Sequence, residues 1–99
     1  MKTFNDILQE LGVHSPDEFY ELMKEHWGNN VDAILTYDPK SEKIELGSIY
    51  SSDRYNLDCG KDLILRLNMP DKEYFNYIWH EIYYVAELEL KRAQGGNNE

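Results

Sequence analysis

The stretch from Tyr74 to Ala93, YFNYIWHEIYYVAELELKRA, restricts the fold of this 99-residue chain more than any other part of its sequence. Its apolar residues recur every three or four positions, which is the period of an α-helix with one buried face. Because a face this wide and apolar must be covered, the sequence predicts a domain packed around a long C-terminal helix. The predicted core face comprises Phe75, Ile78, Trp79, Ile82, Val85, Ala86 and Leu90.

A second row of large side chains lies opposite this predicted core face. Tyr77, Tyr84 and Leu88 follow one another at spacings of seven and four, and Glu81 lies between them. Tyrosine is enriched at interfaces, because it offers a large contact area while losing little side-chain entropy. Three interpretations are open for this row: burial inside the protein beneath the N-terminal helices, a homodimer seam, or a site for a protein partner.

Two short helices are predicted before the first strand. Thr3 is expected to cap the first helix and Gly12 to end it, where left-handed geometry is needed. The sequence SPDE opens the second helix, with Ser15 as the cap, Pro16 at the first helical position and Glu18 completing a capping box. The apolar stripes of the two helices are Phe4, Ile7, Leu8 and Leu11, then Phe19, Leu22, Met23 and Trp27.

Alternating apolar and polar residues predict three strands. Val31–Tyr37 and Ile44–Tyr50 alternate on either side of the turn sequence DPKSEK, which indicates a β-hairpin. The polar stretch SSDRYNLDCGKD, which holds the single cysteine Cys59, is typical of a loop, and Leu63–Leu67 forms a third short strand. A meander is the simplest antiparallel arrangement of these strands. The last helix is then expected to begin at Pro70.

The predicted fold class is α+β in the order ααβββα. We expect a three-stranded antiparallel sheet packed by the long C-terminal helix and the two short N-terminal helices. A chain of this length builds one core, so a single globular domain is expected over residues 1–94, followed by a flexible polar tail over 95–99. The sequence has no signal-peptide run and no bilayer-length apolar stretch. With its lone cysteine, this predicts a cytoplasmic protein without a membrane partner.

The charge of the chain is strongly acidic. Nineteen acids stand against ten bases, which gives a formal net charge of −9 at pH 7. Between Asp6 and Asp38 there are eight acids and one base, Lys24. Such a surface repels nucleic acids and anionic membranes, which argues against a helix-turn-helix DNA reader in the first two helices. The acidity is explained either by solubility or by a positively charged partner.

Four of these acids are concentrated on the second predicted helix. Glu18, Glu21 and Glu25 share one side of it, away from its apolar stripe, and Asp17 precedes them. Their rise along the helix axis is roughly 4.5 and 6 Å, which is loosely the spacing of successive phosphates on a strand. Two interpretations remain open: a solvated helix face, or a row of carboxylates that imitates nucleic acid in a basic groove.

The sequence contains no complete catalytic, metal or cofactor signature. WHEIYY begins like a zinc-protease helix, but Tyr84 stands four residues after His80, where a second histidine is needed. Cys59 lies beside Lys61, yet the sequence identifies no base to activate it as a nucleophile. We therefore expect no enzyme, no metal and no cofactor.

These features predict a small acidic protein-binding module. In this hypothesis the protein is an inhibitor or regulator that occupies the basic, nucleic-acid-binding surface of a partner such as a nuclease, without binding nucleic acid itself. The alternative is a structural or accessory domain that homodimerises through the aromatic C-terminal helix. The predicted contact residues are Asp17, Glu18, Glu21, Glu25, Tyr77, Glu81, Tyr84 and Leu88.

Overall fold

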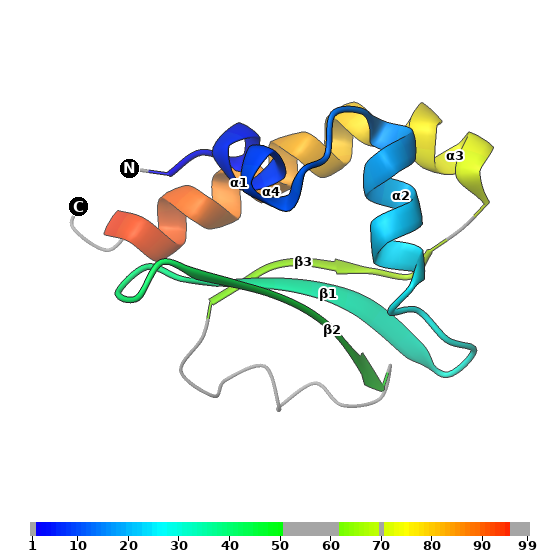
Figure 1. Cartoon of the computed structure of the whole chain (residues 1–99), viewed down its shortest axis with the longest axis horizontal. Coiled ribbons are helices and arrows are strands. Elements are labelled where there is room, and N and C mark those ends of the chain that lie inside the picture. The colour runs from blue at the N-terminus through cyan, green and yellow to red at the C-terminus, as the bar shows by residue number, and fades with distance from the viewer. Residues whose placement is uncertain (1, 51–61, 70, 96–99) are drawn as a thin grey trace.

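The structure, a computed structural model, describes residues 2–50, 62–69 and 71–95 (Figure 1). Cys59 with its predicted loop, Pro70 and residues 96–99 lie outside the described residues. The elements are α1 (Phe4–Leu11), α2 (Pro16–Lys24), β1 (Val31–Asp38), β2 (Lys43–Tyr50), β3 (Asp62–Leu67), α3 (Lys72–Tyr77) and α4 (Trp79–Gly95). The α+β class is confirmed, as is the order of two helices, three antiparallel strands and a C-terminal helix packed on the sheet.

The strand order of the sheet is β2–β1–β3, with β1 in the centre. Both strand pairs are antiparallel, and Leu35 of β1 lies opposite Leu46 of β2 and opposite Leu65 of β3. The predicted meander is therefore wrong, because β3 pairs with β1 and not with β2. The central position suits β1, whose apolar face is almost completely buried, and it gives both edges of this strand a hydrogen-bonding partner.

A bulge in β3 places two consecutive residues in the core. Leu35 pairs with Leu65 and Thr36 pairs with Leu63, so Ile64 has no partner of its own in β1. An extra residue of this kind bends the strand and redirects its side chains. Ile64 and Leu65 are both buried as a result.

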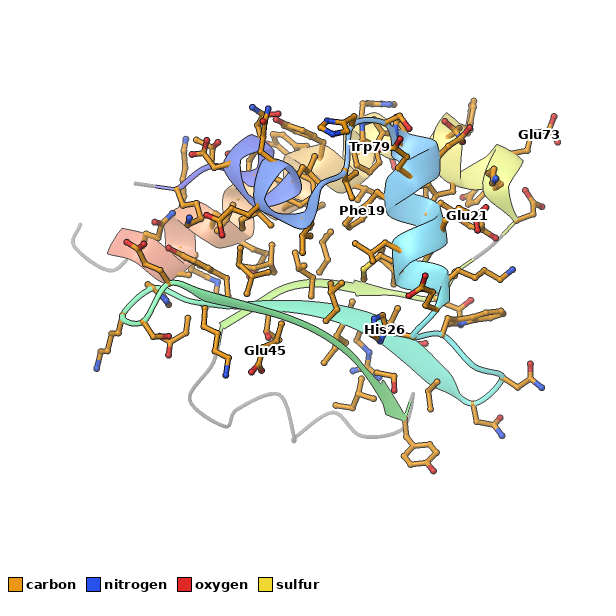
Figure 2. All side chains as sticks on the ribbon, viewed as in Figure 1. Phe19, Glu21, His26, Glu45, Glu73 and Trp79 are labelled. Atoms are coloured by element: carbon orange, nitrogen blue, oxygen red, sulfur yellow. The ribbon has the colours of Figure 1, made fainter. Side chains whose placement is uncertain are left out.

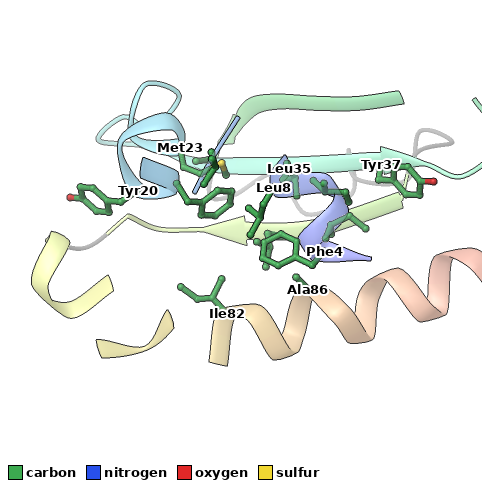
Figure 3. Packing of buried hydrophobic residues seen from close by; sticks show 14 of the residues in the cluster. Phe4, Leu8, Tyr20, Met23, Leu35, Tyr37, Ile82 and Ala86 are labelled. Atoms are coloured by element: carbon green, nitrogen blue, oxygen red, sulfur yellow. The ribbon is translucent and has the colours of Figure 1, made fainter. Parts of the chain in front are cut away.

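All four helices of the described chain lie on one face of the sheet (Figure 1). The helix α4 packs against β3 and α1, while α2 packs against α3 and β1. The apolar side chains between the helices and the sheet form one core (Figure 3). Its labelled members are Phe4, Leu8, Tyr20, Met23, Leu35, Tyr37, Ile82 and Ala86.

Four aromatic rings, one from each of these helices, meet in the helical layer. Phe19 of α2 lies 5.9 Å from Phe4 of α1, 6.2 Å from Phe75 of α3 and 5.6 Å from Trp79 of α4, measured between ring centroids. Figure 2 shows Phe19 and Trp79 near each other in this layer. Aromatic pairs at such separations contribute about 0.5–1.5 kcal/mol each beyond the burial of their surface. This cluster therefore joins all four helices.

The predicted single C-terminal helix is divided at Ile78. This residue has φ −99° and ψ 13°, and its carbonyl accepts the N–H of Glu81 at 3.0 Å as α4 begins. The first of the two helices is capped by Asp71, whose side chain accepts the N–H of Tyr74 at 2.8 Å, so the helix does not begin at Pro70 as predicted. The bend allows α3 to pack on α2 while α4 follows the sheet.

The helices α1 and α2 begin at the predicted N-cap residues, but the predicted contact of the Glu18 side chain differs. Thr3 caps α1, and Gly12 ends it with φ 76°, in the left-handed region. The Ser15 hydroxyl accepts the N–H of Glu18 at 3.2 Å. The Glu18 carboxylate, however, accepts the N–H of His14 at 2.6 Å, so the capping box is not closed onto Ser15 as predicted.

The two ends of the described chain are joined by hydrogen bonds. The backbone N–H of Lys2 donates to Oε1 of Gln94 at 3.0 Å, and Nε2 of Gln94 donates to the carbonyl of Lys2 at 2.8 Å. The ammonium of Lys2 also pairs with the carboxylate of Glu10 on α1. The start of the described chain therefore lies beside the end of α4 (Figure 1).

An ion pair on the other face of the sheet connects all three strands. Asp32 of β1 is only 8% exposed, and its carboxylate accepts Nε of Arg66 in β3 at 2.8 Å. The same arginine donates from Nη2 to the carbonyl of Tyr50 in β2 at 3.1 Å, and Asn68 donates to Asp32 at 3.4 Å. Asp32 therefore has a structural role in the sheet and is not part of an acidic contact surface.

Replacing Asp32 with alanine is expected to lower the free energy of unfolding by about 2 kcal/mol, because it removes the buried carboxylate that pairs with Arg66 and accepts a hydrogen bond from Asn68. The matched control is Lys43→Ala, which removes the exposed pair between Lys43 and Glu45 and should cost less than about 0.5 kcal/mol. Chemical denaturation of both variants measures the difference. Equal losses would show that the Asp32–Arg66 pair contributes no more than an exposed pair.

Candidate functional site

A shallow groove beside α2 gathers the four carboxylates that the sequence predicted on this helix. It has a volume of about 360 Å³. Acidic side chains surround it, while Leu11, Val13 and Leu22 supply apolar surface. The full lining is Leu11, Gly12, Val13, Asp17, Glu18, Glu21, Leu22 and Glu25. The groove can accept a group that is both cationic and partly apolar, such as the side chain of lysine or arginine.

The turn between α1 and α2 builds one wall of this groove. Gly12 has φ 76°, a conformation that glycine adopts without steric cost, and the N–H of Val13 then donates to the carbonyl of Leu8 at 2.9 Å. This closure of α1 leaves Leu11 and Leu22 partly buried at the groove. The apolar spacing had assigned both leucines to buried stripes. For Leu11, its position beside the exposed glycine turn is a sequence signal that could have identified it as a lining residue, whereas Leu22 lies ten residues from this turn and has no such signal.

Two of the carboxylates connect α2 to α3. Asp17 accepts a hydrogen bond from the side-chain amide of Asn76 at 2.7 Å, and Glu21 forms an ion pair with Lys72 at 2.6 Å. The Glu21 carboxylate raises the pKa of the Lys72 ammonium, because it accepts its hydrogen bond and attracts its charge. Figure 2 shows Glu21 on the outer side of α2, away from Phe19. Lys72 therefore neutralises part of the acidic surface.

Helix stability explains why Asp17 and Glu18 stand at the start of α2, but it does not explain Glu25. Asp17 and Glu18 lie in the first turn, where the positive end of the helix dipole favours a carboxylate. Glu25 lies at the C-cap, where the dipole is unfavourable, and it follows Glu21 by one turn with the same charge. Within the described part of the chain, the Glu25 carboxylate has no ion pair or hydrogen bond. The dipole argument predicts that Glu25 lowers the stability of the helix, which makes it a candidate binding residue.

The second row of large side chains is exposed. The exposed fractions are 78% for Tyr77, 65% for Tyr84 and 47% for Leu88, so the interpretation of burial inside the protein is wrong. Glu81 is exposed as well. The row is also interrupted, because Tyr77 lies on α3, before the bend at Ile78, while the others lie on α4.

Val85 joins this exposed surface, although the sequence assigned it to the core face. The helix α1 covers one flank of α4, where the ring of Tyr83 lies 5.1 Å from that of Phe4 and Glu87 accepts the N–H of Phe4 at 3.1 Å. No described element covers the opposite flank. Val85, which lies there, is 46% exposed and neighbours Tyr84.

Seven of the eight predicted contact residues therefore divide into two surfaces. Asp17, Glu18, Glu21 and Glu25 line the groove, and no residue of α3 or α4 is among its lining. Glu81, Tyr84 and Leu88 lie together on the exposed side of α4. Tyr77 belongs to neither, and its ring lies 6.3 Å from that of Tyr74 on α3.

Comparisons with known proteins return no relative: the chain matches no family model, no curated protein and no solved structure. Among residues 2–50, 62–69 and 71–95, no group of three or more His, Cys, Asp or Glu side chains is arranged to hold a metal ion. No helix in the same ranges is long and apolar enough to cross a membrane. The groove on α2 is the candidate site that brings together four of the predicted contact residues.

Glu25→Gln is expected to stabilise the protein by a few tenths of a kcal/mol, because it removes a negative charge from the wrong end of α2. The matched variant Glu18→Gln should destabilise it, because Glu18 lies at the favourable end and accepts the N–H of His14. Thermal unfolding of the two variants should move the midpoint in opposite directions, by roughly 2 °C each. A loss of stability in Glu25→Gln would mean that this carboxylate has a folding role.

Proposed function

We propose that this protein is a small acidic protein-binding module that inhibits or regulates a partner by occupying its basic, nucleic-acid-binding surface. The observation that supports it best is the groove on α2, where four carboxylates surround apolar side chains and one of them, Glu25, opposes the helix dipole. A lysine or arginine of the partner would place its charged head among the carboxylates and its aliphatic stem on Leu11 and Leu22.

The net charge of −9 supports the same role at longer range. Such a charge accelerates encounter with a basic surface and disfavours contact with nucleic acid, so the protein and a nucleic acid would compete for one partner. The attraction depends on charges exposed to solvent, which makes the association sensitive to salt. In this role the chain itself carries no catalytic step, no metal and no cofactor.

The partner interaction is expected to require the groove carboxylates. The immobilised protein should retain nucleic-acid-binding proteins at low salt, release them as salt rises, and lose them to an added DNA oligonucleotide. The triple variant Glu18→Gln, Glu21→Gln, Glu25→Gln should retain at least about tenfold less. Its matched control, Glu10→Gln, Glu42→Gln, Glu73→Gln, removes the same charge elsewhere and should behave like the native protein. Equal retention by both triple variants would exclude the groove as the binding site.

Lys72→Met is expected to strengthen binding to a short oligolysine peptide by roughly threefold, because it frees the Glu21 carboxylate while keeping an apolar side chain near Tyr20. Lys40→Met is the charge-matched control in the hairpin turn, outside the groove. Isothermal titration of both variants at low salt separates a local effect from the change in net charge. An identical gain in both would show that only the overall charge matters.

A further inference from the structure

The exposed side of α4 has an apolar centre with opposite charges at its two ends. Tyr84, Val85 and Leu88 form the centre, Glu81 lies about one turn before Tyr84, and Lys91 lies about one turn after Leu88. All five side chains are exposed, and we call them the α4 strip. Apolar contact residues flanked by charges are the usual composition of an interface core and its rim.

The two charged residues of the α4 strip, Glu81 and Lys91, are too far apart to form an ion pair with each other. Glu81 and Lys91 are ten positions apart, which is about 15 Å along the helix. Neither forms an ion pair with any residue in the described ranges, whereas the adjacent Arg92 is held by Glu89 at 2.7 Å. A partner with a cation near Glu81 and an anion near Lys91 would therefore be complementary to this strip.

A second copy of this chain meets both requirements when its α4 runs antiparallel. With a two-fold axis midway between Tyr84 and Leu88, each tyrosine faces the leucine of the other copy, and each Glu81 faces the other Lys91. A parallel arrangement would instead place Glu81 against Glu81. We propose that this protein forms an antiparallel homodimer through the α4 strip.

The balance of charge also favours a second copy at this surface. Two chains of net charge −9 repel each other, so their contact must be locally neutral. The α4 strip holds one acid and one base, whereas the groove on α2 is lined by four acids and would repel its own copy. One helix of 17 residues, about 25 Å long, gives an interface of small size, so the dimer is weak and forms at high concentration.

The experiment is sedimentation equilibrium of the full chain, from about 10 μM to about 1 mM, at two salt concentrations. The native protein should show a monomer–dimer equilibrium that persists at high salt. Glu81→Lys and Lys91→Glu should each raise the dissociation constant at least about tenfold, and the double swap should restore it to within about threefold. Tyr84→Ala should weaken the dimer as well. Circular dichroism confirms that each variant is folded, since all of these residues are exposed.

The charge-matched control is Glu73→Lys, an equal change at an exposed residue of α3 outside the strip. It should leave the dissociation constant unchanged or lower it by reducing the overall repulsion. A native protein that is monomeric at every concentration overturns the proposal and assigns the strip to a different protein. A double swap that fails to recover the dimer overturns the antiparallel pairing. None of these outcomes depends on the groove. The proposed function is therefore tested separately, by the retention experiment with the groove variants.

Discussion

The packing of Phe19 against Phe4, Phe75 and Trp79 is the contact on which the arrangement of the helices depends. Helices as short as α1 and α3 are not stable alone in water, so each needs a tertiary contact to exist. Phe19 provides a contact to each of them and to α4 from a single position. It also fixes the rotation of α2 about its axis. With Phe19 turned inward, the carboxylates on the other side of the helix must face solvent.

The bend at Ile78 determines which side chains of α3 and α4 lie together at the surface. It turns α3 toward α2, where Lys72 and Asn76 contact two of the groove carboxylates. It also separates the tyrosines of α3 from Tyr84 on α4. One aromatic segment therefore contributes to two unlike surfaces. The first is acidic and concave, and the second is apolar at its centre and nearly neutral, so the two suit different kinds of partner.

The parts of this fold that could be predicted are those set by neighbouring residues. Thr3 and Ser15 determine the helix starts, and the alternation around DPKSEK determines the hairpin, because capping and turn chemistry are local. The position of β3 beside β1 depends on which edge the chain reaches after β2, which no local pattern specifies. The exposure of Val85 depends likewise on which flank of α4 is covered by α1. The acids of the groove were predictable from helical spacing, whereas its apolar lining required the turn at Gly12.

The hydrogen bonds between Lys2 and Gln94 have a consequence for the way this domain can be connected to other sequences. Polypeptide attached before residue 2 or after residue 94 leaves from one corner, at the far end of the long axis from α2 (Figure 1). Domains whose ends lie together tolerate insertion into a loop of a host protein, and a short linker can close them for circular permutation. This one can therefore be carried as an insert, held at a single point of attachment with α2 toward the opposite end.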